Sequence, residues 1–224
     1  MKRTYRTVGA LLALASATFA VSPQPAQAAT GRCPAGSRVA VVGDSLTVDS
    51  ADYTKWLIAA NGYRLAGFDA QYGRRSTVSY SLLGTMVTSA TSAIDTIKRR
   101  ANVDCWVLAI GTNDVGMQAD TSKYPTYITS MTRLIGKTKP IFILDVNVEG
   151  GAYSGLPGAA DREGNWNHAV YTLSSTTYPN VRYVGYSGLI AGNPALLQPD
   201  GIHLTDDGSL QRAIVLVNAL AGGV

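Results

Sequence analysis

The chain has 224 residues, of which 46% are hydrophobic and 15% charged, enough apolar material for one ordinary domain with a buried core. Three basic residues, Lys2, Arg3 and Arg6, begin a segment with the pattern of a leader, and removing them lowers the formal net charge from +4 to +1. No dense block of Lys or Arg remains, so the composition gives no support for a nucleic-acid partner.

Residues 1–28 have the pattern of a signal peptide. A positive start precedes an apolar run from Val8 to Val21, and Ala26-Gln27-Ala28 matches a small-x-small cleavage site. The apolar run is short for a bilayer span, so a retained membrane anchor is the less favoured alternative and we expect no stable membrane span. We predict a signal peptide over 1–28, one mature domain over 29–224, and a secreted or cell-envelope location.

Apolar strand-like runs alternate with helical patterns along the mature chain. The expected strands are Arg38–Val42, Arg64–Ala70, Cys105–Ile110, Ile141–Val148 and Val181–Val184. The expected helices are Asp52–Ala60, a segment with helical spacing of apolar residues from Leu82 to Ile97, Tyr124–Ile135, and a last helix capped by Thr205 or Asp206 and running to Leu220. This alternation predicts an α/β fold with a five-stranded parallel sheet, because parallel strands are joined by helical crossovers.

The segment Glu149–Gly164 breaks this alternation. It contains five glycines and one proline and is long for a connector in a compact domain. Its composition fits a functional loop or lid, and it equally fits a mobile insertion with no role.

Polar and glycine-containing segments follow the predicted strands. Ligands of an open parallel sheet bind beyond the carboxyl ends of its strands, where these segments would meet. The segments are Gly43-Asp44-Ser45-Leu46, Tyr72-Gly73-Arg74-Arg75-Ser76, Gly111-Thr112-Asn113-Asp114 and Asp200-Gly201-Ile202-His203.

Together these segments contain the groups that acyl transfer requires. A serine such as Ser45 is a weak nucleophile without an adjacent base, and His203 is the natural base near neutral pH. Asp200 lies three residues before His203, within reach of its ring as an orienting acceptor. The backbone N–H groups of Ser45 and Gly73 and the side-chain amide of Asn113 are candidate donors to an oxyanion.

Other residues in these segments favour structural interpretations. We interpret Asp44 as a structural hydrogen-bonding residue, Asp114 as part of an Asx turn and helix cap, and His168 as a surface residue. Arg74 and Arg75 are expected to be solvated, with substrate contact as the minor alternative. A phosphate-binding loop is disfavoured because neither G-x-G-x-x-G nor G-x-x-x-x-G-K-[ST] occurs.

In this order the motifs resemble those of the GDSL, or SGNH, hydrolase family. The Gly-Asp-Ser-Leu block at 43–46, the Gly-Thr-Asn-Asp block at 111–114 and the Asp-x-x-His block at 200–203 match the family in full, whereas the second block is reduced to Gly73. The resemblance implies a flavodoxin-like three-layer α/β/α sandwich and ester or thioester hydrolysis without a metal or cofactor. It also implies Ser45 as nucleophile and oxyanion donor, Gly73 and Asn113 as donors, His203 as base and Asp200 as its orienter.

The two cysteines, Cys33 and Cys105, suggest one disulfide in an exported protein. In the flavodoxin-like order, the strands that begin near these cysteines are neighbours, so the bridge would lie at the edge opposite the active site. The chain has two histidines, His168 and His203, and no H-E-x-x-H motif, so a zinc site is poorly supported and no metal or cofactor is expected.

The sequence therefore predicts an exported serine ester hydrolase acting on small-molecule, lipid or glycan esters. An acyltransferase would use the same triad to deliver the acyl group to a sugar or another alcohol, and the motifs do not separate the two. A non-catalytic envelope-binding module is disfavoured, because such a module has no need of Ser45, Asp200 and His203 together. The natural substrate, its chain length and the oligomeric state are left open.

Overall fold

A computed structural model of the protein describes residues 31–148 and 158–223. The central sheet contains β1 (Arg38–Gly43), β2 (Arg64–Ala70), β5 (Cys105–Ala109), β6 (Ile141–Leu144) and β7 (Val181–Val184). These five strands are parallel and lie in the order β2-β1-β5-β6-β7. This is the flavodoxin-like strand order, and it confirms the predicted five-stranded α/β fold.

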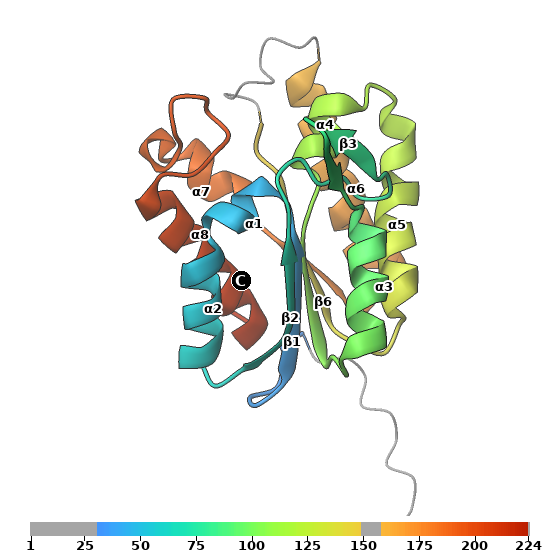
Figure 1. Cartoon of the computed structure of the whole chain (residues 1–224), viewed down its shortest axis with the longest axis vertical. Coiled ribbons are helices and arrows are strands. Elements are labelled where there is room, and N and C mark those ends of the chain that lie inside the picture. Colours follow the sequence, from blue (N-terminus) through green and yellow to red (C-terminus); the bar gives the residue numbers. More distant parts are fainter. Residues whose placement is uncertain (1–30, 149–157, 224) are drawn as a thin grey trace, which may run out of the picture.

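Helices cover both faces of the sheet (Figure 1). One layer contains α1 (Ser45–Asp49), α2 (Ala51–Ala60), α7 (Ser187–Ala191) and α8 (Asp206–Ala221). The other contains α3 (Ala90–Arg100), α4 (Thr112–Met117), α5 (Tyr124–Ile135) and α6 (Ala159–Thr172). Short helical turns complete the connections: η1 (Thr121–Lys123), η2 (Leu173–Thr177) and η3 (Pro194–Leu196).

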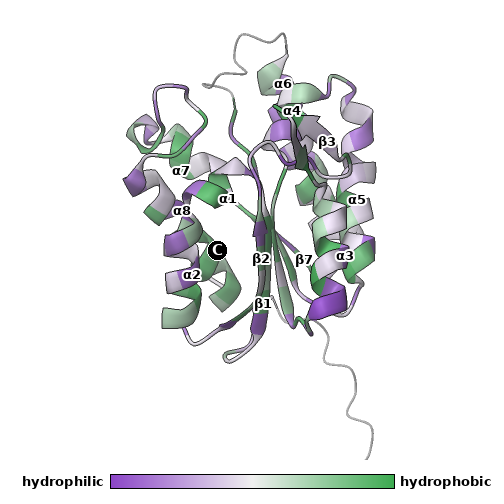
Figure 2. Cartoon of the chain, viewed as in Figure 1, coloured by the Kyte–Doolittle hydropathy of each residue, from purple (hydrophilic) through white to green (hydrophobic). Residues whose placement is uncertain are grey.

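The alternation of side chains along the strands divides the core in two. In β1, Val39 and Val41 belong to the cluster under α2 and α8, whereas Ala40 and Val42 belong to the cluster under α3 and α5. Figure 2 shows hydrophobic residues along most of the sheet, with hydrophilic residues at the ends of β1 and β2 and on the outer helices. Both faces of the sheet are therefore buried, as is typical of parallel sheets.

The segment before α3 differs from the prediction. The apolar spacing from Leu82 suggested a helix, but the chain forms an antiparallel hairpin of β3 (Tyr80–Leu82) and β4 (Thr85–Val87), and α3 begins only at Ala90. The two residues between the strands, Leu83 and Gly84, have φ of 49° and 81°, which matches the backbone that a tight two-residue hairpin requires. Leu82 and Met86 therefore lie on strands and not on one helix face.

The other boundaries are mostly as expected. Tyr124–Ile135 and Arg64–Ala70 agree with the predicted elements, whereas the fourth strand ends at Leu144 rather than Val148. The sequence predicted one irregular segment over 149–164, but residues 159–164 are helical, because α6 (Ala159–Thr172) begins at Ala159. Residues 149–157 and the predicted signal peptide at 1–28 lie outside the described residues.

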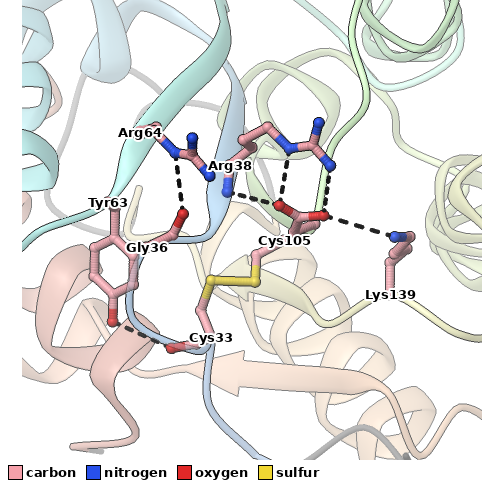
Figure 3. Close-up of a disulfide and its surroundings, with 8 residues drawn as sticks. Cys33, Gly36, Arg38, Tyr63, Arg64, Cys105 and Lys139 are labelled. Carbon is pink, nitrogen blue, oxygen red and sulfur yellow. Dashed lines mark hydrogen bonds and ion pairs between the residues drawn. A yellow bond between two sulfur atoms is a disulfide. The ribbon is translucent and has the colours of Figure 1, made fainter. Parts of the chain in front are cut away.

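The predicted disulfide joins Cys33 and Cys105, whose Cα atoms are 6.0 Å apart (Figure 3). It lies at the amino ends of β1 and β5, where Tyr63 Oη donates to the Cys33 carbonyl and Cys33 N donates to Leu220 O. Beside it, the hydrogen-bonded guanidinium of Arg38 lowers the pKa of Asp104 to about 2. The bridge therefore attaches the start of the domain to the sheet, at the edge opposite the carboxyl ends of the strands.

No helix in residues 31–148 and 158–223 combines the length and apolar character needed to cross a membrane.

Candidate active site

Ser45 is the first residue of α1, directly after the turn that leaves β1. The turn is tight: a Cβ atom on Gly43 would lie 2.1 Å from Thr47 Oγ1, so only glycine fits at this position. The side chain of Asp44 caps α1 by accepting a hydrogen bond from Leu46 N at 3.2 Å. Ser45 is therefore held at a helix N-terminus, at the carboxyl edge of a central strand, where backbone N–H groups favour developing negative charge.

Asp44 directly precedes Ser45 in the chain and is 1% exposed. Burial raises its pKa, while the charge of Arg212 and a hydrogen bond from Thr112 act in the opposite direction. These contacts are those of a structural residue, in agreement with the interpretation from the sequence.

Asp200 and His203 form a hydrogen-bonded pair in the loop before α8. Asp200 Oδ2 lies 2.6 Å from His203 Nδ1, while Asp200 Oδ1 accepts from the backbone N–H groups of Ile202 and His203, each at 2.9 Å. Partial burial alone would raise the pKa of Asp200, but these hydrogen bonds together lower it. Asp200 is therefore ionised at neutral pH and orients the ring, so that Nε2 remains as the acceptor.

The loop containing this pair is fixed at both ends. Gln198 N donates to His203 O at 2.7 Å, and Leu197 pairs with Leu204 in an isolated β-bridge. Thr205 then caps α8 by accepting from Gly208 N at 3.2 Å, and the helix begins at Asp206, three residues after His203. Thr205 is one of the two caps that the sequence predicted.

Contacts between α1, α2 and α8 bring this loop to the side of the sheet where Ser45 lies. Arg212 of α8 donates from Nη1 to Thr47 Oγ1 at 3.2 Å, and Tyr53 of α2 donates to Asp206 Oδ2 at 2.8 Å. Among the described residues, no hydrogen bond joins the Ser45 hydroxyl to the His203 ring. Catalytic hydrogen bonds of this kind are often long in the absence of substrate.

Gly73 and Asn113 are connected through Arg74. Asn113 Nδ2 donates to the Arg74 carbonyl at 3.2 Å, which places the Asn113 amide against the loop that contains Gly73. Gly73 has φ of 76°, a conformation that favours glycine, and its carbonyl accepts from Tyr80 Oη at 2.6 Å. The second and third sequence blocks therefore meet at the carboxyl ends of β2 and β5.

The expectation that Arg74 is solvated is wrong, because this side chain is completely buried. Its guanidinium donates to Asp69 O, Asp69 Oδ1 and Thr88 O at 2.5, 2.6 and 3.0 Å, and to Gly43 O at 3.4 Å. The five N–H donors of the planar guanidinium suit this convergence of oxygens from β1, β2 and the segment before α3. Arg75 is also mostly buried, with Nε 3.6 Å from Asp114 Oδ1.

Asp114 does not cap α4, so its interpretation as a helix cap is wrong. It lies inside the first turn of α4, whose N-terminal cap is Gly111, and it accepts hydrogen bonds from Ser76 N and Ser76 Oγ, each at 2.9 Å. Burial raises its pKa to about 6, despite the hydrogen bonds from Ser76 and the charge of Arg75. Asp114 therefore joins α4 to the second block from within the core.

A model of the GDSL-like Lipase/Acylhydrolase family matches residues 41–210, from β1 into α8. The chain belongs to this family. The membership supports an enzyme that acts on acyl esters, and it confirms the resemblance drawn from the sequence blocks. No curated protein matches the chain.

Solved structures with this fold cover most of the GDSL-family chain at low sequence identity. The C-terminal catalytic domain of Streptococcus pneumoniae peptidoglycan O-acetyltransferase A, with a methylsulfonyl adduct, has a TM-score of 0.64 at 14% identity, over 85% of this chain and 96% of that one. A lipase/acylhydrolase from Enterococcus faecalis has a TM-score of 0.64 at 17% identity, over 83% and 96%. A carbohydrate esterase family 2 enzyme from Corynascus thermopiles has a TM-score of 0.61 at 18% identity, over 86% of this chain and 68% of that one. These similarities show the fold.

Two residues that support the candidate site were missed in the sequence. Arg212 lies on the buried face of α8 with Ser209, Ala213 and Leu216. An arginine among apolar and small residues on one helix face is unusual, and this pattern could have identified it. Tyr80, which supports Gly73, carried no such signal, because its hairpin was not recognised. His168, by contrast, is exposed on α6 beside Thr172, as predicted.

Proposed function

We propose that this protein is an exported serine ester hydrolase that cleaves acyl or acetyl esters through Ser45, His203 and Asp200. In the proposed reaction, His203 Nε2 accepts the Ser45 proton while Oγ attacks the ester carbonyl carbon. The carbonyl π electrons move to oxygen, and the oxyanion accepts hydrogen bonds from the N–H groups of Ser45 and Gly73 and from the Asn113 amide.

The tetrahedral intermediate then collapses to an acyl-enzyme. The bond to the leaving oxygen breaks, and His203 transfers its proton to that oxygen, which releases an alcohol. Water next donates a proton to His203 and attacks the acyl carbon, and collapse of the second intermediate returns that proton to Ser45 with release of a carboxylic acid. No cofactor enters this scheme.

The observation that carries the proposal is the 2.6 Å contact between Asp200 and His203. Two backbone N–H groups hold the other Asp200 oxygen, so the carboxylate is fixed in position before it orients the ring. A structural role for such a pair would not require its ring to be accessible, yet the His203 side chain is 35% exposed. An exposed, oriented imidazole in a family of acylhydrolases supports its use as a base.

The same exposure lets solvent water reach an acyl group held near His203, as hydrolysis requires, and it admits an alcohol acceptor as well. The fold shared with a peptidoglycan O-acetyltransferase domain keeps acyl transfer as the second candidate. Product analysis with p-nitrophenyl acetate, with and without an added sugar acceptor, separates the two. We expect acetate as the main product and its loss in Ser45→Ala; acetylated sugar as the main product would assign a transferase.

We propose export because residues 1–28 match a signal peptide and the mature domain contains a disulfide. The substrates would then be esters of the cell envelope or the surroundings, including polysaccharide acetates and lipids. Amino-terminal sequencing of protein secreted by a bacterial host tests this proposal. A mature chain that begins at Ala29 supports export, whereas retention of Met1 in the cytoplasm would contradict it.

A further inference from the structure

An apolar groove of about 330 Å³ lies beside the candidate active site, between α1, the end of β2 and the β3–β4 hairpin. Its walls include Val48 from α1, Tyr72 after β2, and Leu82, Thr85 and Met86 from the hairpin. Because a water-facing groove of apolar side chains is costly to leave uncovered, its composition indicates an apolar ligand.

The groove lies next to two candidate site positions, Ser45 and Gly73, although neither residue lines it. Val48 follows Ser45 by three residues on α1, so the two side chains lie on the same side of the helix. Leu82 Cδ2 lies only 3.0 Å from the position that a Cβ atom on Gly73 would occupy. A molecule that extends from Ser45 past Gly73 therefore enters the groove directly.

The hairpin exposes apolar side chains that a purely structural strand pair would not need. Met86 is 61% exposed and Leu82 is 38% exposed, and both line the groove. The hairpin is itself fixed to the site by the hydrogen bond from Tyr80 Oη to the Gly73 carbonyl. The apolar wall is therefore held in a defined position next to the candidate oxyanion donor.

We propose that this groove binds the acyl chain of the ester substrate and makes the enzyme selective for a single unbranched chain of medium length. This inference rests on the proposed function. His203 must deliver a proton to the leaving oxygen, so the alcohol lies toward the loop before α8. That loop is on the other side of the sheet from the β3–β4 hairpin, which forms the far wall of the groove (Figure 1), so the groove is left for the acyl side.

The groove volume limits the length of the chain. About 330 Å³ is near the lower end of the volumes of ligand pockets, which favours a single alkyl chain of limited length. Each buried methylene group contributes about 0.8 kcal/mol, which corresponds to at most about a fourfold gain in kcat/KM. Because the groove is open to solvent, we expect a gain of about two- to fourfold for each methylene until it is filled.

The test compares p-nitrophenyl esters from acetate to dodecanoate, each kept below its solubility limit, in wild type, Thr85→Trp and Leu83→Trp. Thr85 lines the groove, whereas Leu83 is 99% exposed at the tip of the same hairpin and does not. We expect kcat/KM to rise to a maximum at an intermediate chain length in wild type and Leu83→Trp. Thr85→Trp should lower the octanoate-to-acetate ratio of kcat/KM at least tenfold. An unchanged ratio in Thr85→Trp would overturn the proposal.

A binding measurement separates failure of the groove from failure of the proposed function. Isothermal titration of octanoate into Ser45→Ala protein should detect binding that is lost in Ser45→Ala/Thr85→Trp and kept in Ser45→Ala/Leu83→Trp. Absence of octanoate binding, or binding insensitive to Thr85→Trp, would overturn the groove even if Ser45 hydrolyses acetate esters. If octanoate binds the Ser45→Ala variants in the expected pattern but the wild-type protein hydrolyses no ester, the alkyl-binding groove is supported and the proposed reaction is refuted.

Discussion

Asn113 donates a hydrogen bond from its side-chain amide to the backbone carbonyl of Arg74, at a distance of 3.2 Å. Arg74 in turn is buried and donates to carbonyl oxygens of Gly43, Asp69 and Thr88. One cation thus holds the ends of β1 and β2 and the segment before α3 around the candidate oxyanion donors. A buried arginine shared between three segments fixes their relative position more firmly than separate loop contacts would.

Asn113→Ala should lower kcat by about 10²–10³-fold with a much smaller change in KM, because the amide is expected to bind the oxyanion most strongly in the transition state. Asn113→Asp should be at least as damaging, since a carboxylate would repel the oxyanion. Steady-state kinetics with p-nitrophenyl acetate measures both variants. If Asn113→Ala lowers the melting temperature while kcat of the folded enzyme stays near that of wild type, Asn113 is structural and does not belong to the site.

The pH dependence of kcat/KM should show one rising limb from acid toward neutral pH, followed by a plateau. A protonated His203 cannot accept the Ser45 proton, whereas Asp200 is ionised across this range because its hydrogen bonds lower its pKa.

Asp200→Ala should lower kcat less than His203→Ala does, since the imidazole ring without its orienting carboxylate remains a base. EDTA should leave the rate unchanged; inhibition by EDTA that zinc reverses would refute this mechanism.

Asp114 should make the protein less stable as the pH rises from about 4 to 6. Its pKa is raised by burial to about 6 from 3.8, so in this range the unfolded chain loses a proton that the folded chain keeps. The resulting loss is on the order of 3 kcal/mol and levels off above pH 6. Urea unfolding of wild type and Asp114→Asn across this range measures it, because the variant lacks the titration. Parallel stability curves for the two proteins would contradict the burial argument.

Removal of the disulfide should destabilise the domain by roughly 2–4 kcal/mol, because Cys33 and Cys105 close a loop with a sequence separation of 72. Chemical unfolding of Cys33→Ala/Cys105→Ala against wild type measures this difference. Since the bridge lies at the opposite edge of the sheet from Ser45, the folded double variant should retain near wild-type kcat. Two free thiols per chain in unreduced, denatured wild-type protein would contradict the bridge.

Much of the fold could be predicted from sequence because the relevant signals are local. The five strands are short apolar runs that end at glycine or polar residues, and the helix Tyr124–Ile135 has an apolar stripe of helical period. The motif positions followed from this order, since the carboxyl ends of parallel strands meet at one edge. The disulfide followed from a pair of cysteines in a chain expected to be exported, and the neighbouring positions of β1 and β5 placed it at the edge opposite the site.

The remaining features depend on contacts between distant segments. Leu82 and Met86 have spacing that fits a helix, but the chain turns back at Leu83 and Gly84, and Tyr80 of the hairpin bonds to the Gly73 carbonyl. The burial of Arg74 depends on oxygens from three segments, which composition around the residue does not indicate. The inward role of Asp114 likewise depends on Ser76, which lies 38 residues earlier in the chain.

Covalent labelling by a fluorophosphonate tests the central claim most directly, since the reagent reacts with an activated serine. The protein should gain one label per chain, located on Ser45 by peptide mass spectrometry, while Ser45→Ala and His203→Ala should show little labelling. The matched variant Ser50→Ala removes a buried hydroxyl from the end of α1 and should label like wild type. Normal labelling of Ser45→Ala, together with unchanged ester hydrolysis, would contradict the assignment of Ser45 as the nucleophile.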